Sequence, residues 1–373
     1  MGVFGAAAFI VGTSLGAGFL SGAELVRFFG AERFLLSVLI SSAVFFVLCT
    51  LFLLLGKRRG GYDGALAIFG KGKNAVKLIL SALSFVPCAG MLAGLDAILP
   101  KLSPLPSILG LMLVLLFLRR GMKGIGALNS ALVPVLLFFV FYSTKGGLVF
   151  SYPTLSGKVW LGIVYAGMNI LLGVPVLLDA GKNMKRPVLS AVFASLVIAA
   201  CAVCVLGVVY REGAGAIFAE LPFLYAMQGS RIFYCASALA ILTSLASAVY
   251  PLLRLCDGIK SAKKKNAARG GIFLAAFALS RLGLSGIGQF FYPAMGILGL
   301  TFSAICVLYE YLFEKHDQKV HRRGKNAQND GRTHDKVKLE HLTAVHDKVS
   351  QPRARNEVLA HDRADPRHAH RDL

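Results

Sequence analysis

Apolar residues fill ten stretches of the chain, separated by Gly, Pro or charged residues. Their centres lie near Gly16, Phe45, Pro87, Leu111, Val135, Asn169, Ile198, Thr243, Phe277 and Phe302. A bilayer core of about 30 Å requires about 20 apolar residues per helix, and most of the stretches reach that length. The ninth is shorter, because Arg281 and several glycines interrupt it. The pattern therefore predicts an all-α integral membrane protein with about ten transmembrane helices.

The composition agrees with this prediction and divides the chain in two. Of the 373 residues, 56% are hydrophobic, and the mean hydropathy is +0.66, which excludes an ordinary soluble enzyme domain. All eight histidines lie beyond residue 313, whereas every Phe, Tyr and Trp lies at or before it. We therefore expect a transmembrane domain over residues 1–313 and a hydrophilic, disordered tail over residues 314–373. We expect no specific nucleic-acid partner for the tail.

Basic residues gather in alternate predicted loops, and the formal net charge is +21. One set of loops holds Lys57, Arg58, Arg59, Lys71, Lys73 and Lys77, then Arg119, Arg120 and Lys123, then Lys182, Lys185 and Arg186, then Lys260, Lys263, Lys264, Lys265 and Arg269. The other set holds far fewer. Because loops rich in Lys and Arg stay in the cytoplasm, we expect both termini there and a location in the inner (plasma) membrane.

Ten spans with both ends on one side can be divided into two sets of five. The first set covers about residues 1–145 and the second about 157–313. Since five is odd, the second set crosses the membrane in the opposite sense, which is the geometry of an inverted repeat. The halves share no evident sequence identity, so this prediction depends on where their helices are interrupted.

Each half begins with a span rich in helix-breaking residues. Residues 9–22 contain Gly12, Gly16, Gly18 and Gly22 together with Thr13, Ser14 and Ser21. Residues 162–175 contain Gly162, Gly167, Gly173, Asn169 and Pro175. Each Gly costs up to about 1 kcal/mol of helix propensity relative to Ala. We therefore expect both spans to be broken near mid-membrane. For the first span, the alternative is that Gly12-x-x-x-Gly16 and Gly18-x-x-x-Gly22 are packing faces of continuous helices.

A broken helix within hydrocarbon leaves backbone groups that a ligand can satisfy. Amide groups around Ala17, Gly18 and Phe19 would attract a carboxylate, and the carbonyl groups that end the preceding half-helix would attract a cation or an ammonium group. The adjacent hydroxyls of Thr243 and Ser244 could add oxygen ligands for a hard cation such as Na⁺. The alternative is that these hydroxyls bond to their own helix.

The stretch Gly16-Ala17-Gly18-Phe19-Leu20-Ser21-Gly22-Ala23-Glu24 resembles the first helix of the YkvI-like membrane proteins, a branch of the amino acid, polyamine and organocation transporter superfamily. The resemblance continues at Phe28-Phe29, Tyr165, Asn169, Glu220-Leu221-Pro222-Phe223-Leu224, Thr243-Ser244 and Tyr292-Pro293, and covers residues 1–313. Leu20 replaces a small residue and Ala23 replaces a glutamine of the family pattern, which puts substrate preference and coupling at those positions in doubt.

The resemblance implies the leucine-transporter fold, with a 5+5 inverted repeat and broken helices 1 and 6. It also implies a sodium ion held by the first and eighth helices, at Gly12, Leu15, Ala240, Thr243 and Ser244. The segment from Glu212 to Ser230 resembles the lid that covers the external vestibule in this fold.

Few acidic residues lie within the predicted spans. Glu24 is a candidate proton site, a gate, or a partner for Arg27 at i+3. Asp96 and Asp179 are expected at the membrane interfaces, the latter beside Lys182. A proton-coupled relative would place a lysine at the cation site, but the fifth predicted span has lysines only at its ends. Sodium coupling is therefore favoured over proton coupling.

These observations predict an ion-coupled symporter for a small amino acid or related amine. The expected substrate-binding residues are Gly16, Ala17, Gly18, Ser21, Tyr165 and Asn169, Na⁺ is the expected coupling ion, and no organic cofactor is expected. Enzymatic activity is not expected, because the spans have no His-Glu metal pattern and no nucleophile-base set. The alternative is a non-transporting membrane sensor or scaffold. The sequence specifies neither the substrate nor the oligomeric state.

Overall fold

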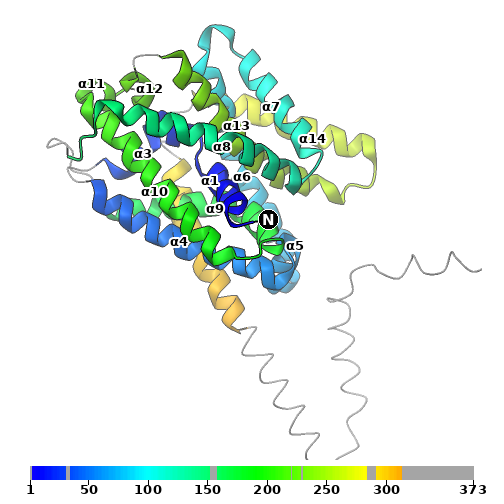
Figure 1. The fold of residues 1–373 in the computed structure, drawn as a ribbon. Coiled ribbons are helices and arrows are strands. Elements are labelled where there is room, and N and C mark those ends of the chain that lie inside the picture. The colour runs from blue at the N-terminus through cyan, green and yellow to red at the C-terminus, as the bar shows by residue number, and fades with distance from the viewer. Residues whose placement is uncertain are drawn as a thin grey trace, which may run out of the picture. The chain divides into compact units, whose positions relative to one another are not determined.

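The structure is a computed structural model. It describes residues 2–30, 34–151, 158–219, 221–227, 230–283 and 291–312, so the predicted tail lies outside the described residues. Met1–Glu310 forms one compact unit. Every regular element in the described ranges is a helix, as Figure 1 shows. The prediction of an all-α protein is confirmed, whereas the boundary at residue 313 and the two repeats stay predictions.

The helices follow one another along the chain with short connections. They are α1 (Val3–Ser14), α2 (Ala17–Ser21), α3 (Ala23–Phe29), α4 (Phe34–Arg59), α5 (Tyr62–Ala65), α6 (Lys73–Ile98), α7 (Leu105–Leu118), α8 (Met122–Ser143), α9 (Trp160–Lys182), α10 (Pro187–Arg211), α11 (Ala214–Ile217), α12 (Pro222–Ala226), α13 (Arg231–Leu255) and α14 (Ala262–Ser280), with the last helix at Phe291–Leu312. Short 3-10 turns are Leu66–Gly72, Pro100–Leu102, Thr144–Gly146 and Cys256–Gly258.

Seven of the described helices are long and apolar enough to cross a membrane. They are Phe34–Arg59, Tyr62–Ile98, Met122–Gly146, Trp160–Lys182, Pro187–Arg211, Phe233–Gly258 and Phe291–Leu312. Helices α1 and α7 are shorter apolar helices, and α14 begins with three consecutive lysines. The ten predicted centres all fall in these helices or, for Gly16, in the break after α1. The chain is therefore a multi-pass membrane protein.

The helices pack in two groups. In the first group, α4 packs against α9 and α10, and α10 packs against α1; in the second, α13 and α14 both pack against α6. Helix α8 contacts both α1 and α13. Large apolar side chains also point outward, including Leu39 of α4, Met112 of α7 and Phe138 of α8. Contact with lipid tails explains these exposed side chains, because the hydrocarbon core of a bilayer contains no water and apolar side chains are stable there.

The first predicted span is broken, as the sequence predicts. Helix α1 ends at Ser14, and Leu15 leaves the helical region with φ −84° and ψ 78°. Helix α2 follows for five residues, and Gly22 then adopts a left-handed conformation, with φ 81°, before α3 begins. Because left-handed backbone is readily adopted by Gly and strained for most other residues, Gly22 permits the second change of direction.

The predicted break in the sixth span is wrong for this structure. Helix α9 runs without interruption from Trp160 to Lys182, with Pro175 inside it. Gly167 lies directly against the backbone carbonyl of Gly296, so the missing side chain allows the last helix to pack closely. The Asn169 amide donates a hydrogen bond to the Tyr165 carbonyl of its own helix, at 3.1 Å. The glycine here provides close helix packing rather than a break.

The segment resembling a lid contains α11 and α12. Helix α12 packs against α2, α3 and α10. At Gly22 an added side chain would meet the backbone of Phe223 at 3.1 Å, so α12 lies against the turn between α2 and α3. Glu220, Gln228 and Gly229 lie outside the described residues.

Candidate functional site

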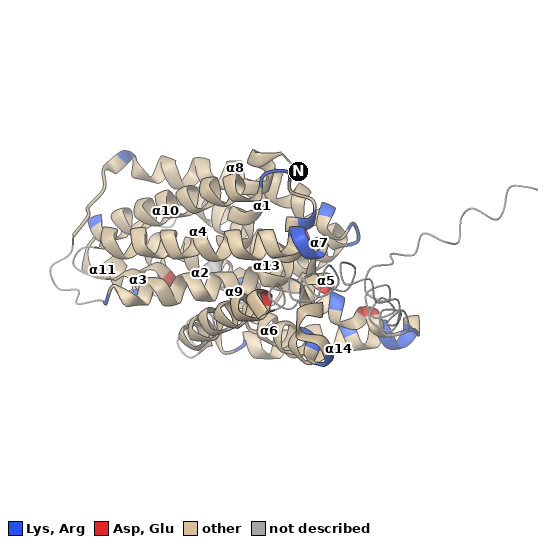
Figure 2. Cartoon of the chain, turned by 90° about the horizontal axis from the view of Figure 1, so that it is seen from below, with Lys and Arg blue, Asp and Glu red and all other residues tan. Residues whose placement is uncertain are grey.

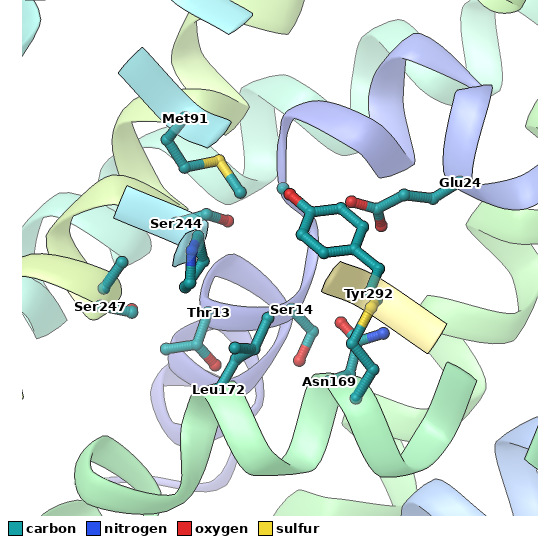
Figure 3. Close-up of a pocket in the computed structure, with 13 residues that line it drawn as sticks. Thr13, Ser14, Glu24, Met91, Asn169, Leu172, Ser244, Ser247 and Tyr292 are labelled. Carbon is teal, nitrogen blue, oxygen red and sulfur yellow. The ribbon is translucent and has the colours of Figure 1, made fainter. Parts of the chain in front are cut away.

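A pocket lies at the break between α1 and α2. It contains about 430 Å³ of space not occupied by atoms, including its opening, and is shown in Figure 3. The lining residues come from α1, α3, α6, α9, α13, the last helix and the break itself: Thr13, Ser14, Gly16, Glu24, Pro87, Met91, Met168, Asn169, Leu172, Ser244, Ser247, Ala248 and Tyr292. Most of this space is narrow or open to solvent, so the pocket is defined by its lining residues rather than by its volume.

Polar groups reach this pocket from the end of α1 at the break and from two other helices. Because α1 stops at Ser14, the hydroxyl-bearing end of the helix reaches the pocket from one side. Ser244 and Ser247 reach it from α13, and Asn169 reaches it from α9. The Ser247 hydroxyl donates to the Thr243 carbonyl at 3.4 Å, a bond within its own helix. The result is a small polar space inside an apolar bundle.

The residues of the predicted sodium site come together between α1 and α13. The Ser244 hydroxyl donates a hydrogen bond to the Gly12 carbonyl at 3.2 Å, which joins the two helices. The Thr243 hydroxyl donates to the Ala240 carbonyl at 2.8 Å, and Leu15 is the residue that ends α1. The Thr243 bond lies within α13, which is the alternative that the sequence left open, and the Ser244–Gly12 bond is the contact of this set that joins α13 to α1 in the described structure. Sodium binding itself stays a prediction.

Some of the predicted substrate-binding residues line the pocket and others do not. Gly16 and Asn169 line the pocket. Ser21 does not line it, because its hydroxyl donates to the Gly18 carbonyl at 3.1 Å and accepts from the Ala23 amide at 3.3 Å. These two bonds support the turn at Gly22.

Tyr165 and the start of α2 are placed beside the pocket. The buried Tyr165 packs against Phe28 and Phe29, with ring centroids 5.2 and 5.0 Å away, and is not among the residues that line the pocket. Gly18 lies against the carboxyl group of Glu24, so a side chain at position 18 would collide with it. The side chain of Ala17 is outside the described ones. The substrate-binding role of all these residues stays a prediction.

Glu24 is the charged group of the pocket. Its side chain is 6% exposed and lines the space beside Tyr292, as Figure 3 shows. The Tyr165 hydroxyl donates to its Oε2 across 3.5 Å, which is a long hydrogen bond. Among the described residues no basic group lies within 4.0 Å of the carboxylate. The suggested ion pair with Arg27, one turn further along α3, is therefore not formed.

Two residues of this region were absent from the predicted site. Tyr292 is 1% exposed, lines the pocket, and has a hydroxyl oxygen with no hydrogen-bond partner. Asn129 of α8 is fully buried and donates to the Phe9 carbonyl of α1 at 3.0 Å. The Tyr292-Pro293 motif is visible in the sequence. The sequence does not show that Tyr292 lies near Glu24, because the two residues are far apart along the chain. An Asn within an apolar span was the available signal for Asn129.

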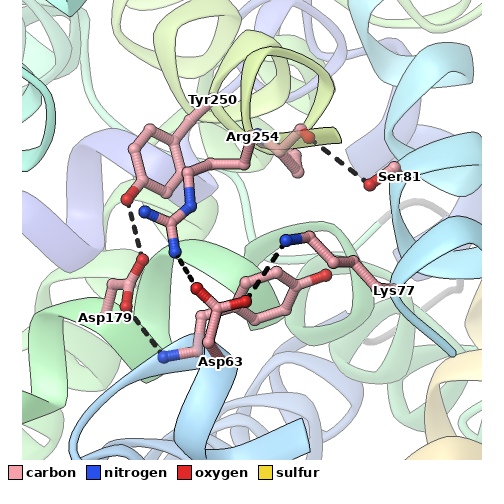
Figure 4. Close-up of polar contacts among 8 residues, drawn as sticks. Asp63, Lys77, Ser81, Asp179, Tyr250 and Arg254 are labelled. Atoms are coloured by element: carbon pink, nitrogen blue, oxygen red, sulfur yellow. Dashed lines mark hydrogen bonds and ion pairs between the residues drawn. The ribbon is translucent and has the colours of Figure 1, made fainter. Parts of the chain in front are cut away.

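A second polar cluster joins the two helix groups near the end of α9, and is shown in Figure 4. We call it the inner cluster: Tyr62, Asp63, Lys77, Asp179, Tyr250 and Arg254. Asp179 Oδ1 accepts from the Tyr62 backbone amide at 2.7 Å, and its Oδ2 accepts from the Tyr250 hydroxyl at 2.7 Å. Asp179 was expected at the interface beside Lys182. Its carboxylate joins α9 to α5 and α13, and its place at the membrane interface stays a prediction.

Asp63 completes the inner cluster. It forms salt bridges with Arg254 of α13 and with Lys77 of α6, the latter at 3.2 Å. Both acids of the cluster belong to α5 and α9, which pack with α4, whereas the side-chain donors belong to α6 and α13. The cluster therefore connects one helix group to the other through opposite charges and hydrogen bonds.

A larger cavity lies beside this cluster, with about 1020 Å³ of space not occupied by atoms. It is bounded by the beginnings of α1 and α8 and by the end of α9. Its lining includes Gly5, Phe9, Lys123, Asp179 and Asn183. Phe9 is one turn of α1 away from Thr13, a residue of the central pocket. The beginning of α1 thus lies between the two spaces.

Comparison with known proteins finds relatives in Bacillus subtilis strain 168. The uncharacterized membrane protein YkvI is 24% identical over 321 residues, covering 78% of this chain and 91% of YkvI. The uncharacterized protein YyaD is 26% identical over 336 residues, covering 81% of this chain and 95% of YyaD. The resemblance to YkvI-like membrane proteins is thereby confirmed. No family model matches the chain.

Among solved structures, the chain is similar to MHP1, a nucleobase-cation-symport-1 family transporter in a closed conformation with bromovinylhydantoin bound. The TM-score is 0.49 at 16% identity, covering 82% of this chain and 77% of the MHP1 chain. It is also similar to the Eremococcus coleocola manganese transporter, with a TM-score of 0.43 at 15% identity, covering 92% and 91% of the two chains.

Proposed function

We propose that the protein is a secondary transporter that carries a small amine or amino acid across the membrane with Na⁺. The observation that carries this proposal is the broken first helix, which opens into a polar pocket inside a multi-pass apolar bundle. Irregular backbone at membrane depth is tolerated where it lines a cavity or binds a solute. A purely structural role gives no reason to maintain such a break.

The position of the Gly12–Ser244 contact supports the proposal of sodium coupling. Gly12 is on α1, which packs with α10, and Ser244 is on α13, which packs with α6. An ion that binds oxygens of both helices favours the arrangement in which the two groups are close. Its binding would therefore change the equilibrium between conformations, as coupling requires.

Alternating access has two supporting features at one end of the bundle. The inner cluster holds the two helix groups together, and the larger cavity offers a route along α1. Figure 2 shows basic residues concentrated at this end, around α5, α14 and the end of α7. By the positive-inside rule this end is cytoplasmic, which would place both termini in the cytoplasm. Breaking the cluster would then accompany opening toward the cytoplasm.

The proposal is tested by solute uptake into proteoliposomes with an imposed Na⁺ gradient. Wild-type protein should accumulate at least one small amine or amino acid, and dissipating the gradient should abolish accumulation. The variant Thr243→Ala should need at least tenfold more Na⁺ for half-maximal uptake. Its thermal unfolding should change little, because the lost hydrogen bond lies within one helix.

Correctly folded protein that accumulates no candidate solute would contradict transport. In that case the non-transporting sensor or scaffold becomes the better explanation, with the pocket as a ligand-sensing site.

A further inference from the structure

We propose that Glu24 is the residue that recognises the substrate, and that the pocket selects small organic amines over the corresponding amino acids. This inference depends on the proposed function and narrows its substrate class. In this arrangement the ammonium group of the substrate binds the Glu24 carboxylate. A substrate carboxylate has no counterpart and weakens binding.

The charges of the pocket lining favour a cation. Glu24 is the charged side chain among its thirteen lining residues, and the others are hydroxyl, amide, thioether, tyrosine or aliphatic groups or glycine. No Lys, Arg or His is present in this described lining. An ammonium ligand would neutralise the one charge present, whereas an anionic ligand would meet a like charge in a low-dielectric space.

Glu24 differs from every other acidic residue that the structure describes. Asp63, Asp96, Glu212, Asp257 and Glu310 each form a salt bridge. Asp179 accepts two hydrogen bonds of 2.7 Å. Glu24 is 6% exposed, and its one hydrogen bond in the described structure is the 3.5 Å bond from the Tyr165 hydroxyl. The Arg27 charge acts on Glu24 from more than 4.0 Å away, so among the described residues the carboxylate forms no direct ion pair. A buried carboxylate inside a membrane bundle without a direct ion pair is a candidate functional site.

The neighbouring groups can complete an ammonium site. An ammonium group offers three hydrogen-bond donors and also binds the faces of aromatic rings. Besides Glu24, the pocket holds the Tyr292 hydroxyl, which is buried without a partner, and the ring of the same residue. The Nδ2 group of Asn169 donates to the Tyr165 backbone carbonyl. The Asn169 side-chain oxygen, Oδ1, can then be the third acceptor, after the Glu24 carboxylate and the Tyr292 hydroxyl. Figure 3 shows the Glu24 carboxyl group directed toward Tyr292.

A carboxylate subsite at the start of α2 is not favoured by the same geometry. Helix α2 has five residues, too few for a substantial helix dipole. The carboxyl group of Glu24 lies against Gly18, near the amides that were expected to bind a substrate carboxylate. A second negative charge at this point would be repelled. A sodium ion near Ser244 could offset this repulsion, so the test compares solutions with and without Na⁺.

The test uses leucine, its decarboxylated amine isoamylamine and its deaminated acid isocaproate, which share the same isobutyl side chain. Binding is measured by thermal stabilisation of the full-length protein purified in detergent, in NaCl and in KCl. Isoamylamine should stabilise the protein at a concentration at least tenfold below that required for leucine, and isocaproate should have no effect. The comparison is extended to other amino acids, each with its decarboxylated amine and its deaminated acid.

Variants then identify the responsible group. Glu24→Gln should lose the response to amines by at least tenfold, and Glu24→Asp, which keeps the charge, should retain most of it. Asp96→Asn is the matched control, because Asp96 pairs with Arg281 outside the pocket. It should respond as wild type does. A response that Glu24→Gln leaves unchanged would overturn the proposal.

Other outcomes also decide the question. Equal or tighter binding of leucine or isocaproate, in either salt, overturns the amine selectivity, and so does the absence of binding across the whole panel. If amino acids are accumulated under a Na⁺ gradient and amines are not, transport stands and this inference fails. If amines bind through Glu24 but nothing is accumulated, this inference stands and transport fails.

Discussion

Acidic side chains lie at two places in this bundle, partly exposed in the inner cluster and buried in the central pocket, and their partners differ. In the inner cluster, Asp63 and Asp179 are matched by a lysine, an arginine, a tyrosine hydroxyl and a backbone amide. In the central pocket, Glu24 has one long hydrogen bond from Tyr165. The matched acids hold helices together. The unmatched acid is available for a ligand.

Physical chemistry explains why the two places have opposite effects on stability. Removing one partner of a matched pair leaves the other without compensation, which is destabilising. Removing an uncompensated buried charge relieves a desolvation cost. The same substitution, carboxylate to amide or alanine, should therefore be harmful to folding in one region and harmless in the other. This contrast is open to direct measurement.

The largest expected effect is at the pocket. Glu24→Gln should lower uptake at least a hundredfold, because the substrate loses its charged partner, while the melting temperature of the ligand-free protein stays the same or rises. Uptake in proteoliposomes and thermal unfolding in detergent measure the two quantities. A marked fall in melting temperature would instead indicate that Glu24 serves a structural role.

The next effect is at the inner cluster. Asp179→Ala removes the acceptor of the Tyr62 and Tyr250 hydrogen bonds and should destabilise the protein by about 1–3 kcal/mol. Tyr250→Phe removes one of the two bonds and should cost less. Denaturation of both variants beside wild type measures the difference. Unchanged stability in Asp179→Ala would remove the distinction between the two regions.

A smaller effect tests the contact between Gly18 and Glu24. Gly18→Ala places a methyl group against the carboxyl group and should lower amine affinity about tenfold, or about 1.4 kcal/mol. In a Glu24→Ala background the same change should have little further effect, because the obstacle is gone. Additive losses in this double-mutant cycle would show that the two residues act independently.

The smallest effect is expected in α9. Pro175→Ala should leave uptake unchanged and should not destabilise the protein, since the helix is continuous on both sides of the residue and Ala adds the backbone N–H that Pro lacks. Uptake and unfolding assays again provide the measurement. If the variant keeps its stability but loses uptake, α9 opens at Pro175 during transport, and the sequence-based expectation of a second break applies to another conformation.

The sequence predicted the spans and the first break well, because both depend on local properties. The length of an apolar stretch determines whether it can cross a bilayer, and four glycines within residues 9–22 weaken one helix directly. The second break was predicted from the same kind of residues and is absent. Gly167 is used for packing against Gly296, a contact between distant segments that composition cannot reveal.

The site was predicted in part for the same reason. Gly16, Glu24 and Asn169 were identified because they are unusual within apolar spans, and they line the pocket. Tyr292 was not identified as a lining residue, because a tyrosine near a span end is common. The pairing of Asp63 with Arg254, which lies 191 residues further along the chain, could not be read from either residue alone. The packing of both α5 and α13 against α9 brings them together.

The most direct test of this account is Na⁺-gradient-driven uptake of labelled isoamylamine and leucine into proteoliposomes containing wild type or Glu24→Gln. The account predicts that wild type accumulates the amine in preference to the amino acid, and that Glu24→Gln accumulates neither above the level without a gradient. Equal accumulation by the two proteins would contradict it, because the unpaired carboxylate at the broken helix would then have no part in binding the solute.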